Sequence, residues 1–115
     1  MTSDATRSAE PLFGHMVYFR LKDRSPEACQ RLVAACHEHL AGHPGTVLYA
    51  AGTLANSNRE VNDRDFDVAL QLVFANRAAH DAYQIAERHR QFVDQNRGNW
   101  DRVRVFDADV FTTPR

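Results

Sequence analysis

Two segments of the chain alternate with a period of two and carry apolar side chains on both faces. In residues 13–21, alternate positions are apolar or histidine, and Met16 and Tyr18 occupy the opposite face. Residues 65–74 repeat the pattern, with Ala69 and Val73 on the second face. Such strands must be covered on both sides. This requirement constrains the fold more than any other feature of the sequence.

Helical signals follow each of these strands. Ser25 and Pro26 suit the N-cap and the first helical position, and apolar residues then recur at helical spacing, which predicts a helix over 26–41. A second helical segment begins after the capping residue Asn76. On a straight helix Arg90 would interrupt its apolar stripe, so we expect a break near 87–89.

After that break we expect only a short turn around Phe92 and Val93, ended by Gly98. Residues 46–54 and 103–111 are the remaining predicted strands, and the polar segment 55–64 is a loop.

The predicted order is βαββαβ, the α+β ferredoxin-like pattern: an antiparallel four-stranded sheet with two helices on one face. The chain has 115 residues, which suits one domain. We assign that domain to residues 12–112 and a disordered N-terminal tail to residues 1–11.

Two helices leave the other face of the sheet uncovered. That face would expose a continuous set of apolar side chains, too large to leave in water. Its predicted members are Met16, Tyr18, Ala69, Val73, Phe106 and Val110. We expect a homodimer formed through this open sheet face, giving a dimeric α/β barrel. The alternative is that the N-terminal tail covers it.

Composition excludes several classes of partner. The formal charge is −1, so neither nucleic acid nor an anionic membrane surface is an expected partner. The sequence has no signal-peptide pattern and no apolar run of the roughly 20 residues that span a bilayer. Cys29 and Cys36 lie about 10 Å apart along a helix, too far for a disulfide. We therefore expect buried thiols and a cytoplasmic protein.

Three residues are candidates for chemistry. His15 lies mid-strand on the helix-facing side, where burial favours its neutral form. Tyr83 and His89 both come from the second helical region, where a hydroxyl can polarise a carbonyl oxygen while an imidazole moves a proton. Structural alternatives exist for each: a core histidine, a core aromatic and a helix cap, respectively.

We predict no metal and no cofactor. Cys36, His39 and His43 share a helix face, but His43 falls where the helix should end, and no zinc motif accompanies them. Asp107 and Asp109 share a strand face, where such carboxylates usually pair with a cation or face water.

Three motifs, in order and at matching spacing, resemble the stress-responsive A/B barrel (Dabb) family. They are the strand that begins at His15, the Tyr83-to-His89 spacing followed by Phe92, and Trp100 followed by the strand that reaches Asp107. The resemblance covers about residues 13–111.

The resemblance implies a dimeric α+β barrel with a cavity between sheet and helices in each subunit. By likeness to the polyketide-cyclising branch of the family, Tyr83 would orient the substrate, His89 would act as the base and His15 would line the cavity. The cavity would be mainly apolar. Its expected substrate-binding residues are Val17, Phe19, Val68, Leu70, Phe92 and Trp100.

The leading hypothesis is a protein of this family that binds a small, largely apolar molecule, with acid/base chemistry of a cyclase or lyase type. One alternative is a non-enzymatic stress-protective oligomer. Another is a cofactor-free monooxygenase of the dimeric barrel superfamily.

Overall fold

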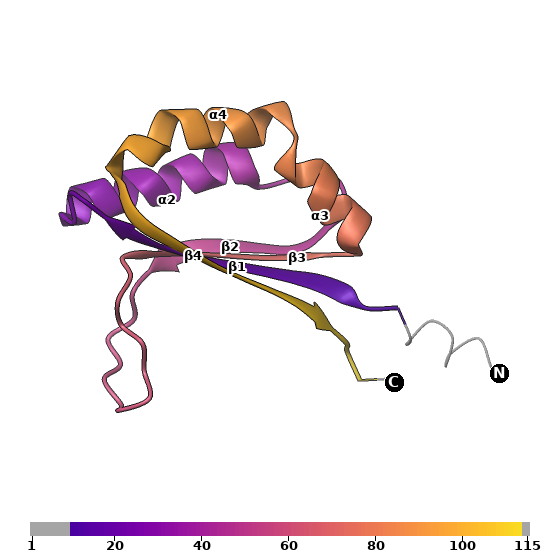
Figure 1. Ribbon diagram of the computed structural model, residues 1–115, viewed down its shortest axis with the longest axis horizontal. Coiled ribbons are helices and arrows are strands. Elements are labelled where there is room, and N and C mark those ends of the chain that lie inside the picture. Colours follow the sequence, from indigo (N-terminus) through magenta and orange to yellow (C-terminus); the bar gives the residue numbers. More distant parts are fainter. Residues whose placement is uncertain (1–9, 114–115) are drawn as a thin grey trace.

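A computed structural model describes residues 10–113 of the chain. Its elements are β1 (Leu12–Leu21), α2 (Pro26–Leu40), β2 (Thr46–Thr53), β3 (Val68–Phe74), α3 (Arg77–Gln84), α4 (Glu87–Asn96), the short 3-10 helix η1 (Arg97–Asn99) and β4 (Trp100–Val110). The strands form one antiparallel sheet in the order β2-β3-β1-β4 (Figure 1). This is the predicted ferredoxin-like fold.

The first strand holds the sheet together, because it pairs with both β3 and β4. His15 lies opposite Leu72 on one side and Asp107 on the other. The alternation in β1 sends the odd-numbered residues toward the helices, where Val17 and Phe19 are 5% and 2% exposed. The predicted alternation of this strand is thus confirmed.

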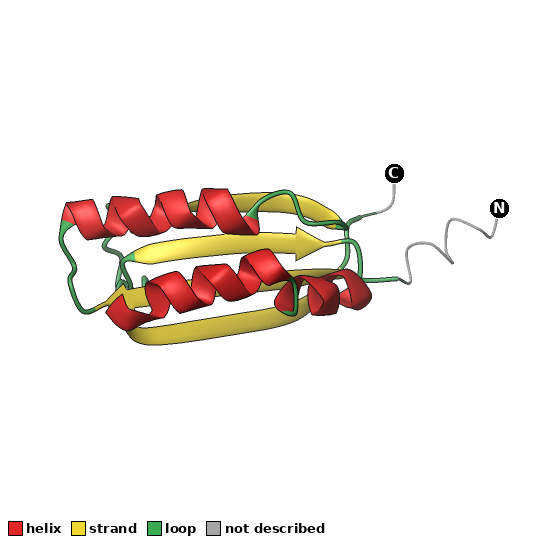
Figure 2. Cartoon of the chain, turned by 90° about the horizontal axis from the view of Figure 1, so that it is seen from above, coloured by secondary structure: helices red, strands yellow, loops and turns green. Residues whose placement is uncertain are grey.

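The helices all lie over one face of the sheet (Figures 1 and 2). Ser25 caps α2 by accepting a hydrogen bond from the backbone N–H of Ala28, and Asn76 caps α3 in the same way through Ala79. Because the helices cover a single face, the core forms between that face and the helical layer.

The second helical region differs from the prediction. The break falls at Ile85 and Ala86 rather than at 87–89, and a helix of ten residues follows it instead of a short turn. Ala86 is extended, with φ −68° and ψ 148°, so the helical phase restarts there. Phe92 consequently faces the core at 2% exposure while Arg90 faces solvent. In residues 10–113, α2, α3 and α4 therefore cover the sheet, where two helices were expected.

Strand boundaries also shift. β3 begins at Val68 instead of residue 65, because the Asp67 carboxylate accepts hydrogen bonds from the Leu21 backbone N–H and the Arg24 guanidinium. β4 begins at Trp100, ahead of the predicted residue 103. Of the predicted tail, residues 1–9 lie outside the described residues.

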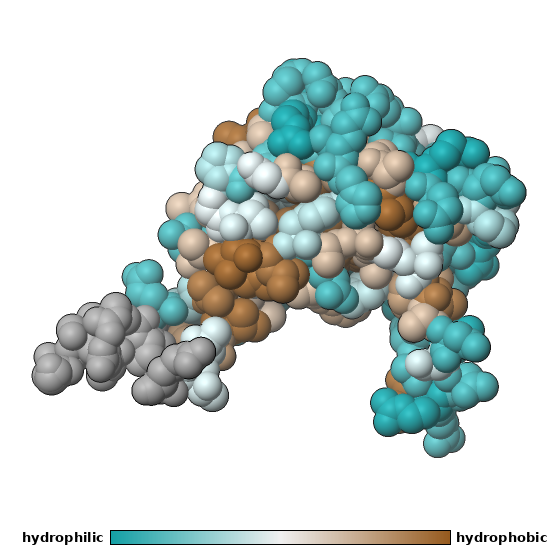
Figure 3. Space-filling model, turned by 180° about the vertical axis from the view of Figure 1, so that it is seen from behind, coloured by the Kyte–Doolittle hydropathy of each residue, from teal (hydrophilic) through white to brown (hydrophobic). Residues whose placement is uncertain are grey.

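Hydrophobic surface collects at the level of the sheet. Seen from behind, the helical layer is mostly hydrophilic, and the strongly hydrophobic surface lies lower (Figure 3). On the open face Phe106 is 54% exposed and Val110 is 38% exposed in the single chain. Within residues 10–113, therefore, no helix covers these side chains, and the alternative cover, the N-terminal tail, lies mostly outside the described residues.

The turn between α2 and β2 requires glycine at residue 45. Gly45 has φ +82°, and a Cβ there would lie 2.4 Å from the Cβ of Ala79 in α3. We predict that Gly45→Ala destabilises the fold by about 2–4 kcal/mol, from left-handed strain plus overpacking. Chemical denaturation of the variant measures this free energy of unfolding.

Gly42→Ala is the matched control. Gly42 has φ +80°, but nothing lies within 4 Å of an added Cβ. Gly42→Ala should lower the free energy of unfolding only by the backbone strain, about 1–2 kcal/mol. Equal losses in the two variants would show that the contact with Ala79 contributes nothing.

Candidate functional site

A cavity of about 270 Å³ lies between the sheet and the α3–α4 segment. Most of its wall is apolar or aromatic, and four polar groups with imidazole or carboxylate chemistry face it: His15, His80, His89 and Asp107. Its other lining residues are Val17, Phe19, Leu40, Leu70, Tyr83, Gln84, Phe92, Val93, Trp100, Val103 and Val105. An apolar pocket with a few convergent polar groups is the usual form of a small-molecule site.

On the sheet side of the cavity, His15 and Asp107 form a close pair. The Nδ1 atom of His15 lies 2.6 Å from Oδ1 of Asp107, across the β1–β4 register. The side chain of His15 is 6% exposed and that of Asp107 is 43% exposed. Burial lowers the pKa of His15, and the bond to Asp107 opposes that shift in part. The pair thus joins a buried imidazole to a carboxylate that is open to solvent.

Tyr83 lies among imidazole rings. It is 2% exposed, and its ring stands edge-on to His89 and His43 with centroids 4.8 and 5.1 Å away. His15 is 6.0 Å away. Burial raises the pKa of the Tyr83 hydroxyl well above its ordinary value, so the group stays protonated and can donate a hydrogen bond.

His89 occupies the first turn of α4. Within residues 10–113 no protein group forms a hydrogen bond with its imidazole. Burial lowers its pKa, and the nearby His15, His43 and His80 lower it further. A cap role would place a histidine at the end of a helix, whereas α4 begins here. The geometry therefore leaves a neutral imidazole with free nitrogens at the cavity wall.

Among the cavity residues that the sequence analysis did not predict are two polar side chains of α3, His80 and Gln84. His80 is 8% exposed and packs against Phe13, with ring centroids 4.4 Å apart. The Gln84 amide nitrogen lies 3.5 Å from Nε2 of His15. His80 precedes Tyr83 by three positions, so helical spacing alone puts the two on one face of α3. That spacing is the sequence signal that could have identified His80 as a neighbour of Tyr83.

Most of the predicted substrate-binding residues line the cavity. These are Val17, Phe19, Leu70, Phe92 and Trp100. Val68 is not among the lining residues, because it is fully buried in the core. In the group of Cys36, His39 and His43, Nε2 of His43 donates a hydrogen bond to the carbonyl oxygen of His39 near the end of α2.

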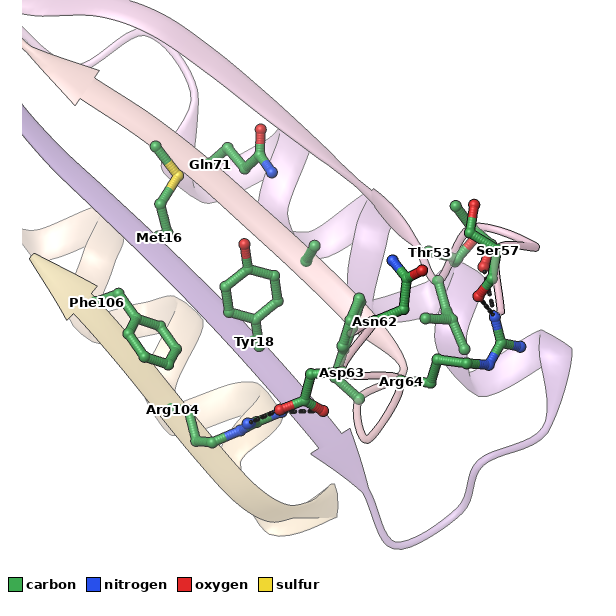
Figure 4. A pocket seen from close by; sticks show the side chains of 14 residues that line it. Met16, Tyr18, Thr53, Ser57, Asn62, Asp63, Arg64, Gln71, Arg104 and Phe106 are labelled. Carbon is green, nitrogen blue, oxygen red and sulfur yellow. Dashed lines mark hydrogen bonds and ion pairs between the residues drawn. The ribbon is translucent and has the colours of Figure 1, made fainter. Parts of the chain in front are cut away.

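A second hollow, of about 620 Å³, lies on the open sheet face under the loop that joins β2 to β3 (Figure 4). Met16, Tyr18 and Phe106 form its apolar floor, with Tyr18 and Phe106 at a centroid distance of 5.9 Å. Nothing in this hollow resembles the histidine cluster on the other side of the sheet.

The loop above the second hollow is tied to the sheet by an ion pair. Arg104 of β4 donates to the Asp63 carboxylate at 2.7 Å (Figure 4). It also donates to the backbone carbonyl of Asp65 at 3.0 Å. The Arg104 guanidinium holds the pKa of Asp63 below its ordinary value. This arrangement fixes the loop and supplies no free acid or base.

Comparisons with known proteins agree on the fold. The family model described as Stress responsive A/B Barrel Domain matches residues 13–110. No curated protein matches the sequence. No helix in the described part of the chain is long and apolar enough to cross a membrane.

Solved structures with the same fold come from several organisms. A Dabb family protein from Mesorhizobium loti is 20% identical, with TM-score 0.73, over 90% of this chain and 100% of that one. A dimeric ferredoxin-like protein from Thermobifida fusca is 19% identical, with TM-score 0.72, over 88% of this chain and 92% of that one. Hydroxynitrile lyase from Passiflora edulis is 18% identical, with TM-score 0.71, over 90% of this chain and 99% of that one. At these identities the likeness establishes the fold alone.

We predict that acid destabilises the protein through His89. Its pKa is lowered in the folded state, so the unfolded chain binds more protons, and the free energy of unfolding falls as the pH drops below the ordinary histidine pKa of about 6.5. The thermal midpoint should therefore decrease between about pH 7.5 and about pH 5.

His89→Gln should reduce that decrease, whereas His37→Gln, which removes an exposed histidine, should preserve it. An identical pH dependence in wild type and His89→Gln would contradict the assignment.

Proposed function

Since the chain belongs to the stress-responsive A/B barrel domain family, we propose that its helix-side cavity binds a small, largely apolar molecule and performs acid/base chemistry on it. One observation carries this proposal. A neutral imidazole with free nitrogens, His89, stands beside a protonated buried phenol, Tyr83, at the wall of an apolar cavity.

The cavity sets the size and polarity of the ligand. A volume of about 270 Å³ lies just below the range of about 300–1,000 Å³ that is usual for small-molecule pockets. Phe19, Phe92 and Trp100 form one aromatic group on its wall, with centroid distances between 5.0 and 6.2 Å. Such walls favour a flat apolar or aromatic body.

Each polar group then has a role in proton transfer. Tyr83 donates a hydrogen bond to a carbonyl oxygen of the ligand, and His89 takes a proton from the adjacent carbon. The protonated imidazole returns that proton to the product, so no electrons are exchanged and no cofactor is consumed. His15, supported by Asp107, lines the same wall and supports the negative charge that develops.

The reaction class is that of a cyclase or a lyase. One structural neighbour is named a hydroxynitrile lyase, which is compatible with acid/base chemistry on this fold. The two cysteines are free and buried, and burial raises the pKa of Cys36 to about 12. Such inert thiols suit a reducing compartment, and we place the protein in the cytoplasm.

We also propose that two copies pair through the open sheet face. Tyr18, Phe66 and Phe106 form an aromatic group there, and two structural neighbours are described as dimeric. An isologous pairing buries the same group from each copy. It leaves the helix-side cavity of each protomer separate.

Hydroxyacetophenone tests the chemistry, because it offers an aromatic body, a carbonyl oxygen and a weakly acidic methyl group. In D₂O the protein should accelerate deuterium exchange at that methyl group, as followed by proton NMR. His89→Gln should slow the catalysed exchange by about 10²–10⁴-fold, the usual contribution of a general base.

His37→Gln is the control and should exchange at the wild-type rate, because this exposed histidine lies outside the cavity lining. Exchange that is unaffected by His89→Gln would remove His89 as the base. A wild-type protein that neither binds nor exchanges the ketone would favour the non-enzymatic, stress-protective role.

The dimer is tested by placing a charge on the open face. Phe106→Glu should give a monomer in multi-angle light scattering at micromolar concentration, because the new carboxylate would be buried unpaired between the copies. Ile85→Glu is the control: Ile85 is 86% exposed on the helical side and should leave the dimer intact. A wild-type monomer would contradict this interface.

A further inference from the structure

Three potential metal ligands meet on one wall of the cavity. They are His15, His80 and Asp107, and their candidate ligand atoms all lie within 4.8 Å of one another. The grouping includes His80, which neither the sequence motifs nor the proposed acid/base chemistry use. We propose that this group binds one divalent transition-metal ion of the Zn²⁺ type.

His80 has the form of a preorganised ligand. Its Nδ1 lies 3.0 Å from the Asp81 carboxylate, and donation of that N–H leaves the lone pair on Nε2. Nε2 is buried and has no hydrogen-bond partner among the described residues. Metal-bound histidines usually donate their other ring N–H to a carboxylate in this way. A buried acceptor without a partner is a position where a cation is favoured.

His15 and Asp107 supply the other two ligands. Nδ1 of His15 and Oδ1 of Asp107 already face each other at 2.6 Å, so an ion would replace the proton between them. Tetrahedral coordination with metal–ligand distances of about 2.0–2.2 Å places ligand atoms about 3.3–3.6 Å apart. Binding therefore requires the His15–Asp107 pair to open by about 1 Å and separations of up to 4.8 Å to close by about 1–1.5 Å, and Asp107, which is 43% exposed, can move.

The donor set decides the kind of ion. Two imidazoles and one carboxylate suit Zn²⁺ and similar transition-metal ions, while Mg²⁺ and Ca²⁺ prefer oxygen ligands. Three protein ligands leave coordination positions free, and all three residues line the cavity, so those positions face its interior. The inference does not rest on the proposed proton transfer at His89, because an ion can bind here whether or not that reaction occurs.

The direct test is titration of chelator-treated protein with Co²⁺ and Zn²⁺ in the absence of any organic ligand. We expect one ion per chain by calorimetry, visible d–d absorption from bound Co²⁺ and a higher thermal midpoint with Zn²⁺. A wild-type protein that binds neither ion would overturn the proposal.

Variants locate the site. His80→Gln and Asp107→Asn should each weaken Co²⁺ binding by on the order of 100-fold, because even an outer-shell partner contributes about 10–100-fold. His37→Gln and Cys36→Ser are the controls and should bind as wild type does. Should His80→Gln fold poorly, the partly exposed Asp107 gives the same test without disturbing the core.

Two results would contradict the assignment. One is undiminished Co²⁺ binding in both ligand variants. The other is a thiolate-to-cobalt charge-transfer band that disappears in Cys36→Ser, which would move the site to the end of α2. Neither result depends on deuterium exchange in the ketone, so failure of the metal site and failure of the proposed reaction are distinguishable.

Discussion

The position of β1 between β3 and β4 is the constraint on which the rest of the structure depends. Because both of its edges are paired, its alternate side chains must serve two different surfaces. His15, Val17 and Phe19 face the helices, and Met16 and Tyr18 face the other side. The site and the proposed interface are thus opposite faces of one strand, and a shift of one residue in register would exchange them.

The cavity exists because the helices do not cover the whole of their face of the sheet. They pack mainly on β1, β2 and β3. In β4, Val103 and Val105 point to the helical side but remain 39% and 50% exposed in the single chain. The space beside β4 is therefore bounded by the sheet below and by α3 and α4 above. The break at Ala86 turns α4 so that Phe92 and His89 reach this space.

The strands and the helix caps could be predicted because their signals are local. Alternation identified β1 and β3, and Ser25 and Asn76 marked the helix starts. The lengths of the helices after Asn76 could not be predicted, because one extended residue, Ala86, restarts the phase and has no turn-forming side chain to announce it.

The predicted cavity wall shows the same limit. Odd-numbered residues of β1 could be placed from alternation alone, but Val68 is buried too deep to reach the cavity. The partnership of Asp107 with His15 depends on the register of strands that are far apart in sequence. The place of His80 beside them depends on how α3 crosses the sheet. Such relations are tertiary, and no local pattern encodes them.

The central claim is that the chain uses the helix-side cavity, and not the larger hollow on the open face, to hold a small molecule. NMR titration of the protein with hydroxyacetophenone tests this most directly. His89 lines the helix-side cavity, and the methyl group of Met16 lies in the hollow on the open face, so each signal reports on one of them. The account predicts saturable shifts of the His89 imidazole and Tyr83 ring signals while the Met16 methyl signal stays in place. Shifts of Met16 with an unchanged His89 would contradict it.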